Sequence, residues 1–142
     1  MTKNKGRVQN RERSLPLYDP PAPQEPWHKP DPGQGERYLI DFRLSSRSRI
    51  KGWTQSGESD RMLDFCLLAQ VLHDGDWWNV VKVDTCHNEV HAHFYYRTRT
   101  YADREVIKPI TCLNDVDSGY QLAEILVITC WSEHVARWRD GI

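Results

Sequence analysis

Half of the six histidines in the 142-residue chain lie within the short stretch 87–93, beside an aspartate and two arginines. An imidazole exchanges protons near neutral pH, a carboxylate can orient it or bind a metal ion, and a guanidinium group stabilises negative charge. Such a group of side chains marks a candidate site for catalysis or ligand binding. Its members are Asp84, His87, His91, His93, Arg97 and Arg99.

A strand is expected to carry most of these residues, because apolar and polar side chains alternate from Glu89 to about Thr98. The expected apolar face holds Val90, Ala92, Phe94 and Tyr96, and the expected polar face holds Glu89, His91, His93, Tyr95 and Arg97.

A second strand, from Trp77 to Asp84, is expected to pair with the first through a turn over residues 85–88. In that register Asp84 lies opposite Glu89, and Lys82 lies opposite His91, so that Lys82 and Asp84 join the polar face. We expect the chemistry to be carried by Lys82, Asp84, His91, His93 and Arg97, with ligand binding supported by Trp78, His87, Tyr95 and Arg99.

Three interpretations of this polar face are open at the level of the sequence. In the first, His87, His91 and His93 bind a divalent metal ion as cofactor, since alternate residues of a strand project from one face. In the second, a neutral and a protonated histidine cleave RNA as base and acid, while Lys82 or Arg97 stabilises the developing charge. In the third, the face only binds a protein or nucleic acid, or is the wet side of an antiparallel sheet.

The remaining pattern predicts a single α+β domain over residues 36–142. Its antiparallel sheet has about four or five strands and is packed on one face by a long C-terminal helix. One strand is expected at Tyr38–Leu44 and an edge strand near Glu105–Ile107. Within the turn-rich stretch 45–58, residues 50–53 are as consistent with a loop as with a short strand.

The segment Arg61–Leu72 has the composition of either a helix or a strand that is covered on both faces. We predict a strand, because the Asp74-Gly75 pair that follows is typical of a two-residue hairpin turn between apolar runs. That turn places Val71 opposite Trp78 and Ala69 opposite Val80. A helix that ends at Gly75 is the alternative.

The long C-terminal helix is expected to follow a capping box formed by Ser118 and Gln121. No helix-breaking residue interrupts the chain from Leu122 until Gly141. The sequence therefore predicts one continuous helix that reaches at least Trp138.

The N-terminal stretch, residues 1–35, holds seven of the eight prolines and begins with several lysines and arginines. Few apolar residues are present there to offset the loss of chain entropy on folding, so we expect a disordered leader. Its basic start would contact nucleic acid or an acidic partner, or would only solubilise the chain. Trp27 is expected either to fold back onto the domain or to anchor a partner.

The composition excludes several classes of protein. The net charge of −1 provides no general attraction for a polyanion, so nucleic-acid binding would need a local patch. No membrane span or secretory signal is recognisable, and the expected location is the cytoplasm. The four cysteines form no C-x-x-C pair, which argues against a zinc ribbon or a compact disulfide framework.

The spacing Trp78-x-x-Val81-x-x-Asp84-x-x-His87-x-x-x-His91-x-His93, with the helical segments that begin at Gly119 and Trp131, resembles small uncharacterised proteins of actinobacteria and their phages. More distantly, the basic-then-aspartate strand followed by histidines and a helix is similar to the TumE-type toxins of toxin–antitoxin pairs. The match to the TumE helix is loose. The first resemblance implies a bacterial or phage source, and the second implies an RNA-directed toxin.

The sequence therefore favours a small bacterial or phage accessory protein that binds or acts on nucleic acid, with a histidine-dependent ribonuclease-like toxin as its enzymatic version. The alternatives are a protein-interaction or inhibitor module without catalysis, and a metal-binding protein that uses the His-x-His strand.

Overall fold

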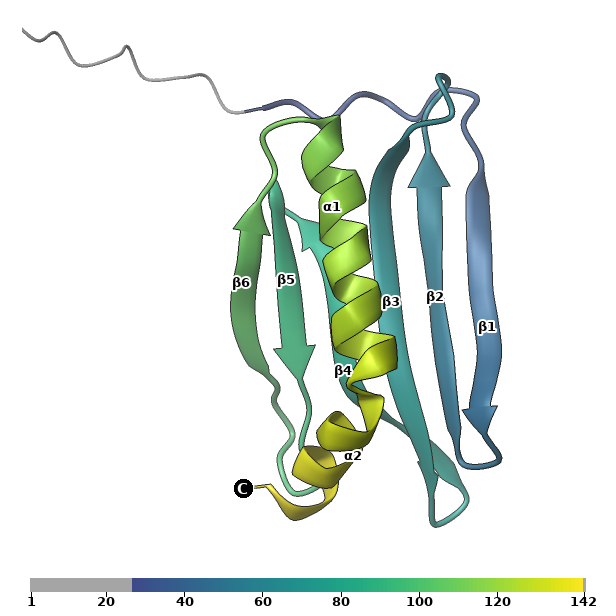
Figure 1. Cartoon of the computed structure of the whole chain (residues 1–142), viewed down its shortest axis with the longest axis vertical. Helices are drawn as coiled ribbons and strands as arrows, with labels where there is room; N and C mark the ends of the chain where they lie inside the picture. The colour runs from purple at the N-terminus through teal and green to yellow at the C-terminus, as the bar shows by residue number, and fades with distance from the viewer. Residues whose placement is uncertain (1–26, 142) are drawn as a thin grey trace, which may run out of the picture.

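The computed structural model describes residues 27–141 and contains one six-stranded antiparallel sheet in which every strand pairs with its neighbour in the chain (Figure 1). The prediction of an α+β fold is confirmed, although the predicted number of strands was too low. The strands are β1 (Arg37–Ser45), β2 (Ser48–Ser56), β3 (Met62–His73), β4 (Asp76–Cys86), β5 (Glu89–Phe94) and β6 (Asp103–Pro109). The stretch that was consistent with a loop is the nine-residue strand β2.

The C-terminal region is not one helix but consists of α1 (Leu113–Glu124), the π-helical segment η1 (Ile125–Thr129) and α2 (Trp131–Asp140). The helix begins at Leu113, before the predicted cap residue Ser118. The Asp115 carboxylate in its first turn accepts 2.8 Å hydrogen bonds from both the backbone N–H and the hydroxyl of Thr111, which lies just before the helix. Within residues 27–141, none of these helices is long and apolar enough to cross a membrane.

The three helical segments cross one face of the sheet in front of β3, β4 and β5 (Figure 1). Apolar residues from alternate strand positions meet those of α1 and η1 there and form the core. Its fully or nearly fully buried members include Ile50, Phe65, Leu67, Ala69, Val81, Val83, Val90, Ala92, Val116, Ala123 and Val127. No described helix packs on the opposite surface, which we call the open face.

The segment Met62–His73 is the strand β3, as predicted. Asp74 and Gly75 both have positive φ angles, as a two-residue hairpin turn requires, and Val71 lies opposite Trp78. The register then shifts, so that Ala69 faces Val81 rather than the predicted Val80. Val80 is an extra residue on β4, which makes this irregularity a β-bulge.

The β4–β5 connection is a two-residue turn made of His87 and Asn88, not the predicted turn over residues 85–88. Both residues have positive φ angles, 52° and 58°, which is the requirement of a type I′ turn. The predicted register was therefore wrong by two residues: Asp84 faces His91, and Lys82 faces His93. Because side chains alternate with a period of two, this error leaves these four residues on their predicted face. Val80, which the predicted register also placed on that face, is instead buried in the core.

The predicted disordered leader lies outside the described residues as far as residue 26. The remaining part, 27–35, runs along one end of the sheet (Figure 1). There Trp27 packs against the core, and its carbonyl accepts a hydrogen bond from the Asn88 side chain. Trp27 therefore folds back onto the domain, one of the two expectations for it.

At Gly119 the helix α1 lies very close to β5. A Cβ atom at this position would lie 2.7 Å from Val90 Cγ2. Gly119→Ala should lower the free energy of unfolding by about 1–3 kcal/mol through overpacking, despite the preference of helices for alanine of about 1 kcal/mol. Urea denaturation followed by circular dichroism measures the change. Glu124→Ala, at an exposed position of the same helix, is the control, and a stabilised Gly119→Ala variant would contradict the close approach.

Candidate functional site

Two parallel rows of side chains cross the open face, because the registers of β2, β3, β4 and β5 align their alternate residues. The first row is Trp53, Cys66, Asp84 and His91, and the second is Lys51, Leu68, Lys82 and His93. The prediction that Lys82, Asp84, His91 and His93 share one sheet face is thus confirmed.

Asp84 lies at the centre of the polar part of these rows. Its Oδ2 is 3.6 Å from Lys82 Nζ, and its Oδ1 is 3.4 Å from His93 Nε2. Within residues 27–141, Oδ1 is buried and accepts no well-aligned hydrogen bond, so its contact with His93 is electrostatic. The three side chains are 21% to 29% exposed, which leaves them accessible from the open face.

Burial and charge together determine the protonation of this group. Burial lowers the pKa of His93 below its ordinary value of 6.5; the Asp84 carboxylate opposes this shift, and the Lys82 ammonium reinforces it. Burial disfavours the charge on Lys82, but Tyr95 and Asp84 outweigh that effect and raise the Lys82 pKa. Burial also raises the pKa of the Cys66 thiol. At neutral pH a neutral imidazole therefore lies beside an ammonium–carboxylate pair.

His91 belongs to the same row but is only 1% exposed. Its Nε2 lies 2.8 Å from Glu89 Oε1 and also 2.8 Å from Arg104 Nη2. One ring nitrogen either donates a hydrogen to the carboxylate or accepts one from the guanidinium group, so the two contacts are exclusive. His91 is therefore fixed between β5 and β6, and its ring is not available to a ligand on the open face.

Three of the other predicted residues lie elsewhere. The Arg97 backbone N–H donates to the Trp138 carbonyl, and its side chain reaches the Arg139 carbonyl at the end of α2. Arg99 forms an ion pair with Asp103. Trp78 packs against Trp138, with ring centroids 5.8 Å apart, on the helix-covered side of the sheet. These residues are not brought together with Asp84.

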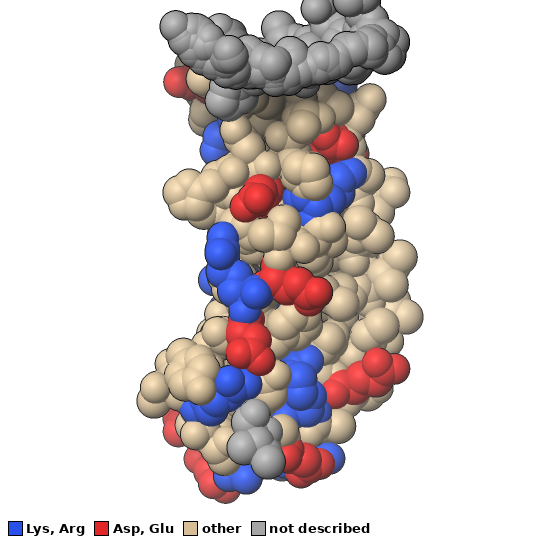
Figure 2. Space-filling model, turned by 90° about the vertical axis from the view of Figure 1, so that its left-hand side faces the viewer, with Lys and Arg blue, Asp and Glu red and all other residues tan. Residues whose placement is uncertain are grey.

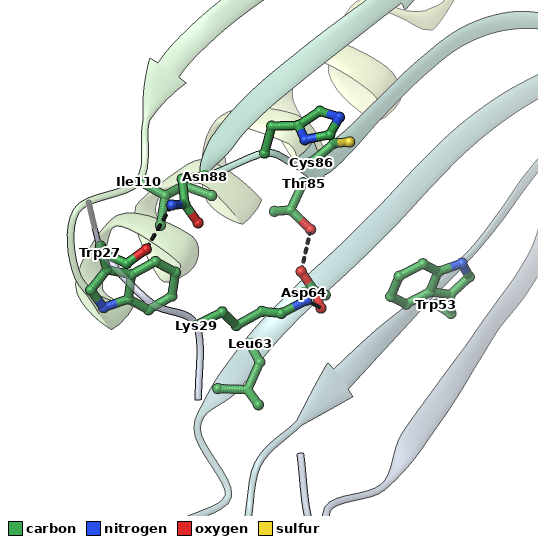
Figure 3. Close-up of a pocket in the computed structure, with 10 residues that line it drawn as sticks. Trp27, Lys29, Trp53, Leu63, Asp64, Thr85, Cys86, Asn88 and Ile110 are labelled. Carbon is green, nitrogen blue, oxygen red and sulfur yellow. Dashed lines mark hydrogen bonds and ion pairs between the residues drawn. The ribbon is translucent and has the colours of Figure 1, made fainter. Parts of the chain in front are cut away.

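His87 lines a separate cavity of about 430 Å³ at the end of the sheet. Figure 3 shows the polar groups of this cavity already engaged with one another: Lys29 meets the Asp64 carboxylate, which also accepts a hydrogen bond from the Thr85 hydroxyl. No group of three or more His, Cys, Asp or Glu side chains in the described part of the chain is arranged to hold a metal ion. The predicted set of His87, His91 and His93 does not form such a group.

The open face also holds an aromatic and basic surface that the sequence analysis missed. The Arg37 guanidinium lies 4.0 Å from the centre of the Trp53 ring. Those of Arg43 and Arg49 lie 5.0 Å and 4.1 Å from the Trp77 ring. We call these five residues the Trp/Arg surface. The alternation Arg49-x-Lys51-x-Trp53 is the sequence signal that would have indicated the two members on β2.

The chain belongs to the family described as "Domain of unknown function (DUF7718)", whose model matches residues 31–141. No curated protein matches the chain, and no solved structure does.

The electrostatic coupling within the site predicts a shift in the His93 titration. Asp84→Asn should lower the pKa of His93 further, because the carboxylate is the group that opposes the effect of burial. NMR titration of the imidazole resonances measures this pKa, with Asp41→Asn on the distant strand β1 as the control. An unchanged or raised His93 pKa in Asp84→Asn would contradict the geometry.

The lowered pKa of His93 in the folded protein also makes stability depend on pH. Because the folded-state pKa of His93 is lowered, the unfolded chain binds a proton more readily than the folded one. The contribution of neutral His93 to stability is present above about pH 6.5, the ordinary histidine pKa, and is lost as the pH falls through the folded-state value. The loss should be smaller in His93→Gln when unfolding is measured across this range.

Proposed function

We propose that the protein is a bacterial or phage accessory protein whose open face binds single-stranded nucleic acid. The observation that carries the proposal is the Trp/Arg surface, in which two tryptophan rings on one uncovered sheet face are each approached by arginine guanidinium groups. Aromatic rings and guanidinium planes both stack on unpaired bases, and the arginines also neutralise phosphates.

The distribution of charge supports the same proposal. The chain as a whole has a net charge of −1, so attraction for a polyanion must come from a local surface. Arg37, Arg43 and Arg49 supply it beside the tryptophans, and Lys51 extends the basic group toward Lys82 in the second row. Asp41, 4.0 Å from Lys51, offsets only part of this charge.

The polar group around Asp84 adds a means of contacting base edges. The Asp84 side chain is 21% exposed on the open face, and a carboxylate readily accepts a hydrogen bond from an exocyclic amino group. It occupies the same row as Trp53, with Cys66 between them. A strand of nucleic acid that stacks on Trp53 would therefore pass close to this acceptor.

The catalytic version of the proposal is the RNA-directed toxin implied by the resemblance to TumE-type proteins. Two-histidine cleavage needs both imidazoles at the substrate, whereas His91 is 1% exposed and held by its neighbours. His93, with a lowered pKa and Lys82 close to the same carboxylate, is the better candidate for a general base. We therefore propose binding as the primary function, and RNA cleavage with His93 as general base as a second activity of the same face.

Tryptophan substitutions test the binding proposal. Trp53→Ala and Trp77→Ala should each weaken binding of a fluorescein-labelled 12-nucleotide single strand by roughly 5- to 150-fold, which corresponds to about 1–3 kcal/mol for one lost stacking contact. Fluorescence anisotropy measures the dissociation constants at several salt concentrations, and the wild-type affinity should fall as salt rises.

Trp78→Ala is the matched control, because it removes the same side chain from the other side of the sheet. Its dissociation constant should stay within about twofold of the wild-type value if its fold is intact, since the lost ring makes no contact with the ligand. Equal losses in all three variants, or no binding by the wild-type protein, would refute the proposal and favour a protein-interaction module.

A ribonuclease assay tests the catalytic addition. If the protein cleaves RNA, His93→Ala and the His91→Ala/His93→Ala double variant should both lose the activity, because neither retains a base at the surface. Parallel reactions with and without a chelator test the need for a divalent ion. An unchanged cleavage rate in the double variant would remove the histidine mechanism.

A further inference from the structure

We propose that strand β1 is a self-association edge, at which β1 of a second copy pairs antiparallel about a two-fold axis through Leu39. The inference rests on the free edge and its residue pattern, and it does not depend on nucleic-acid binding. Addition of a strand to an exposed sheet edge derives its affinity from main-chain hydrogen bonds and its register from side-chain pairs.

The outer edge of β1 has a regular set of unpaired backbone groups. Within residues 27–141, β1 pairs only with β2 and forms one margin of the sheet (Figure 1). The Glu36 carbonyl accepts a hydrogen bond from Ser56 N–H, 2.9 Å away, on the β2 side. Backbone groups point alternately to the two sides of an antiparallel strand, so Arg37, Leu39 and Asp41 direct theirs to the free edge.

The opposite edge of the sheet, formed by β6, has features that hinder pairing with another chain. Pro109 ends β6 without a backbone donor, and the register shifts opposite Val90 and His91. Viewed from that side, basic and acidic side chains are intermingled along the molecule (Figure 2). Proline, irregular register and charge are the features that keep an edge strand from pairing with another chain. The regular part of β1, up to the shift after Arg43, has no proline or bulge.

The side chains of β1 expose apolar area on both faces of this edge. Leu39 is 81% exposed on the open face, and Tyr38 is 51% exposed on the other face. A strand paired at this edge would place apolar side chains next to both residues, since neighbours on adjacent strands lie within contact distance.

The charges of β1 indicate that the strand paired with it is β1 of a second copy, and they favour one pairing register. With Leu39 facing its own counterpart, Arg37 of each copy faces Asp41 of the other, which gives two symmetric ion pairs on the open face. Centring the axis on Ile40 would set Arg37 against Arg43, and centring it on Asp41 would oppose two aspartates. Centring it on Phe42 would extend the pairing into the register shift after Arg43.

Sedimentation equilibrium in the absence of nucleic acid tests the proposal. The full-length chain should reach twice its 16.7 kDa mass as its concentration rises. Asp41→Arg should weaken the dimer at least tenfold, because it opposes two arginines across the axis. The double variant Arg37→Asp/Asp41→Arg should restore the dimer, since it only reverses the direction of each ion pair.

The matched control is Arg43→Asp/Asp41→Arg, which has the same composition as the rescuing variant but places no carboxylate opposite position 41. It should remain as weak as Asp41→Arg, and rescue by this variant instead would overturn the register. Leu39→Lys, at a residue 81% exposed and therefore tolerant of substitution, should also weaken the dimer. Circular dichroism verifies the fold of each variant.

A wild-type chain that stays monomeric at several hundred micromolar would overturn the proposal, as would variants that dimerise as well as the wild-type chain. Because no nucleic acid is present, either result leaves the proposed binding function to its own test. A positive result would join two open faces into one continuous sheet surface, with a Trp53 side chain on each side of the axis.

Discussion

The alternation of side chains along β3 is the constraint on which both faces of the molecule depend. Phe65 and Leu67 are buried beneath the helices, and the pleat of the strand then requires Cys66 and Leu68 to project from the open face. The neighbouring strands are hydrogen-bonded to β3 and follow the same alternation. Burial of the core on one side thereby fixes which residues form the rows of polar, basic and aromatic groups on the other.

This dependence explains why much of the site could be predicted from the sequence. The alternation from Glu89 to Phe94 identifies the faces of β5 without any knowledge of the helices. The β4–β5 turn was mispredicted because His87-Asn88 lacks the usual Asn-Gly or Asp-Gly signature of a type I′ turn. The resulting error in register was an even number of residues, so Asp84 kept its place on the polar face.

Other features depend on contacts between residues distant in the sequence, and local patterns do not reveal them. The burial of His91 requires Arg104 from β6, which lies on the next strand. Arg97 is drawn to the end of α2 by carbonyl groups roughly forty residues later in the chain. The strand β2 was obscured by serines and by Gly52, which lies where a Cβ would meet the Cys66 carbonyl. Close backbone approach, rather than a turn, accounts for that glycine.

The bulge at Val80 has a consequence for how the two halves of β4 are related. Val80 and Val81 both point into the core, so the side-chain phase before the bulge is opposite to the phase after it. The Val80 carbonyl also accepts hydrogen bonds from Tyr95 N–H and from the Arg137 side chain of α2. This one extra residue therefore changes which alternate positions of β4 project from the open face, and the two hydrogen bonds hold it in place. As a result, Trp77 before the bulge and Lys82 after it lie on the same face although they are five positions apart in the sequence.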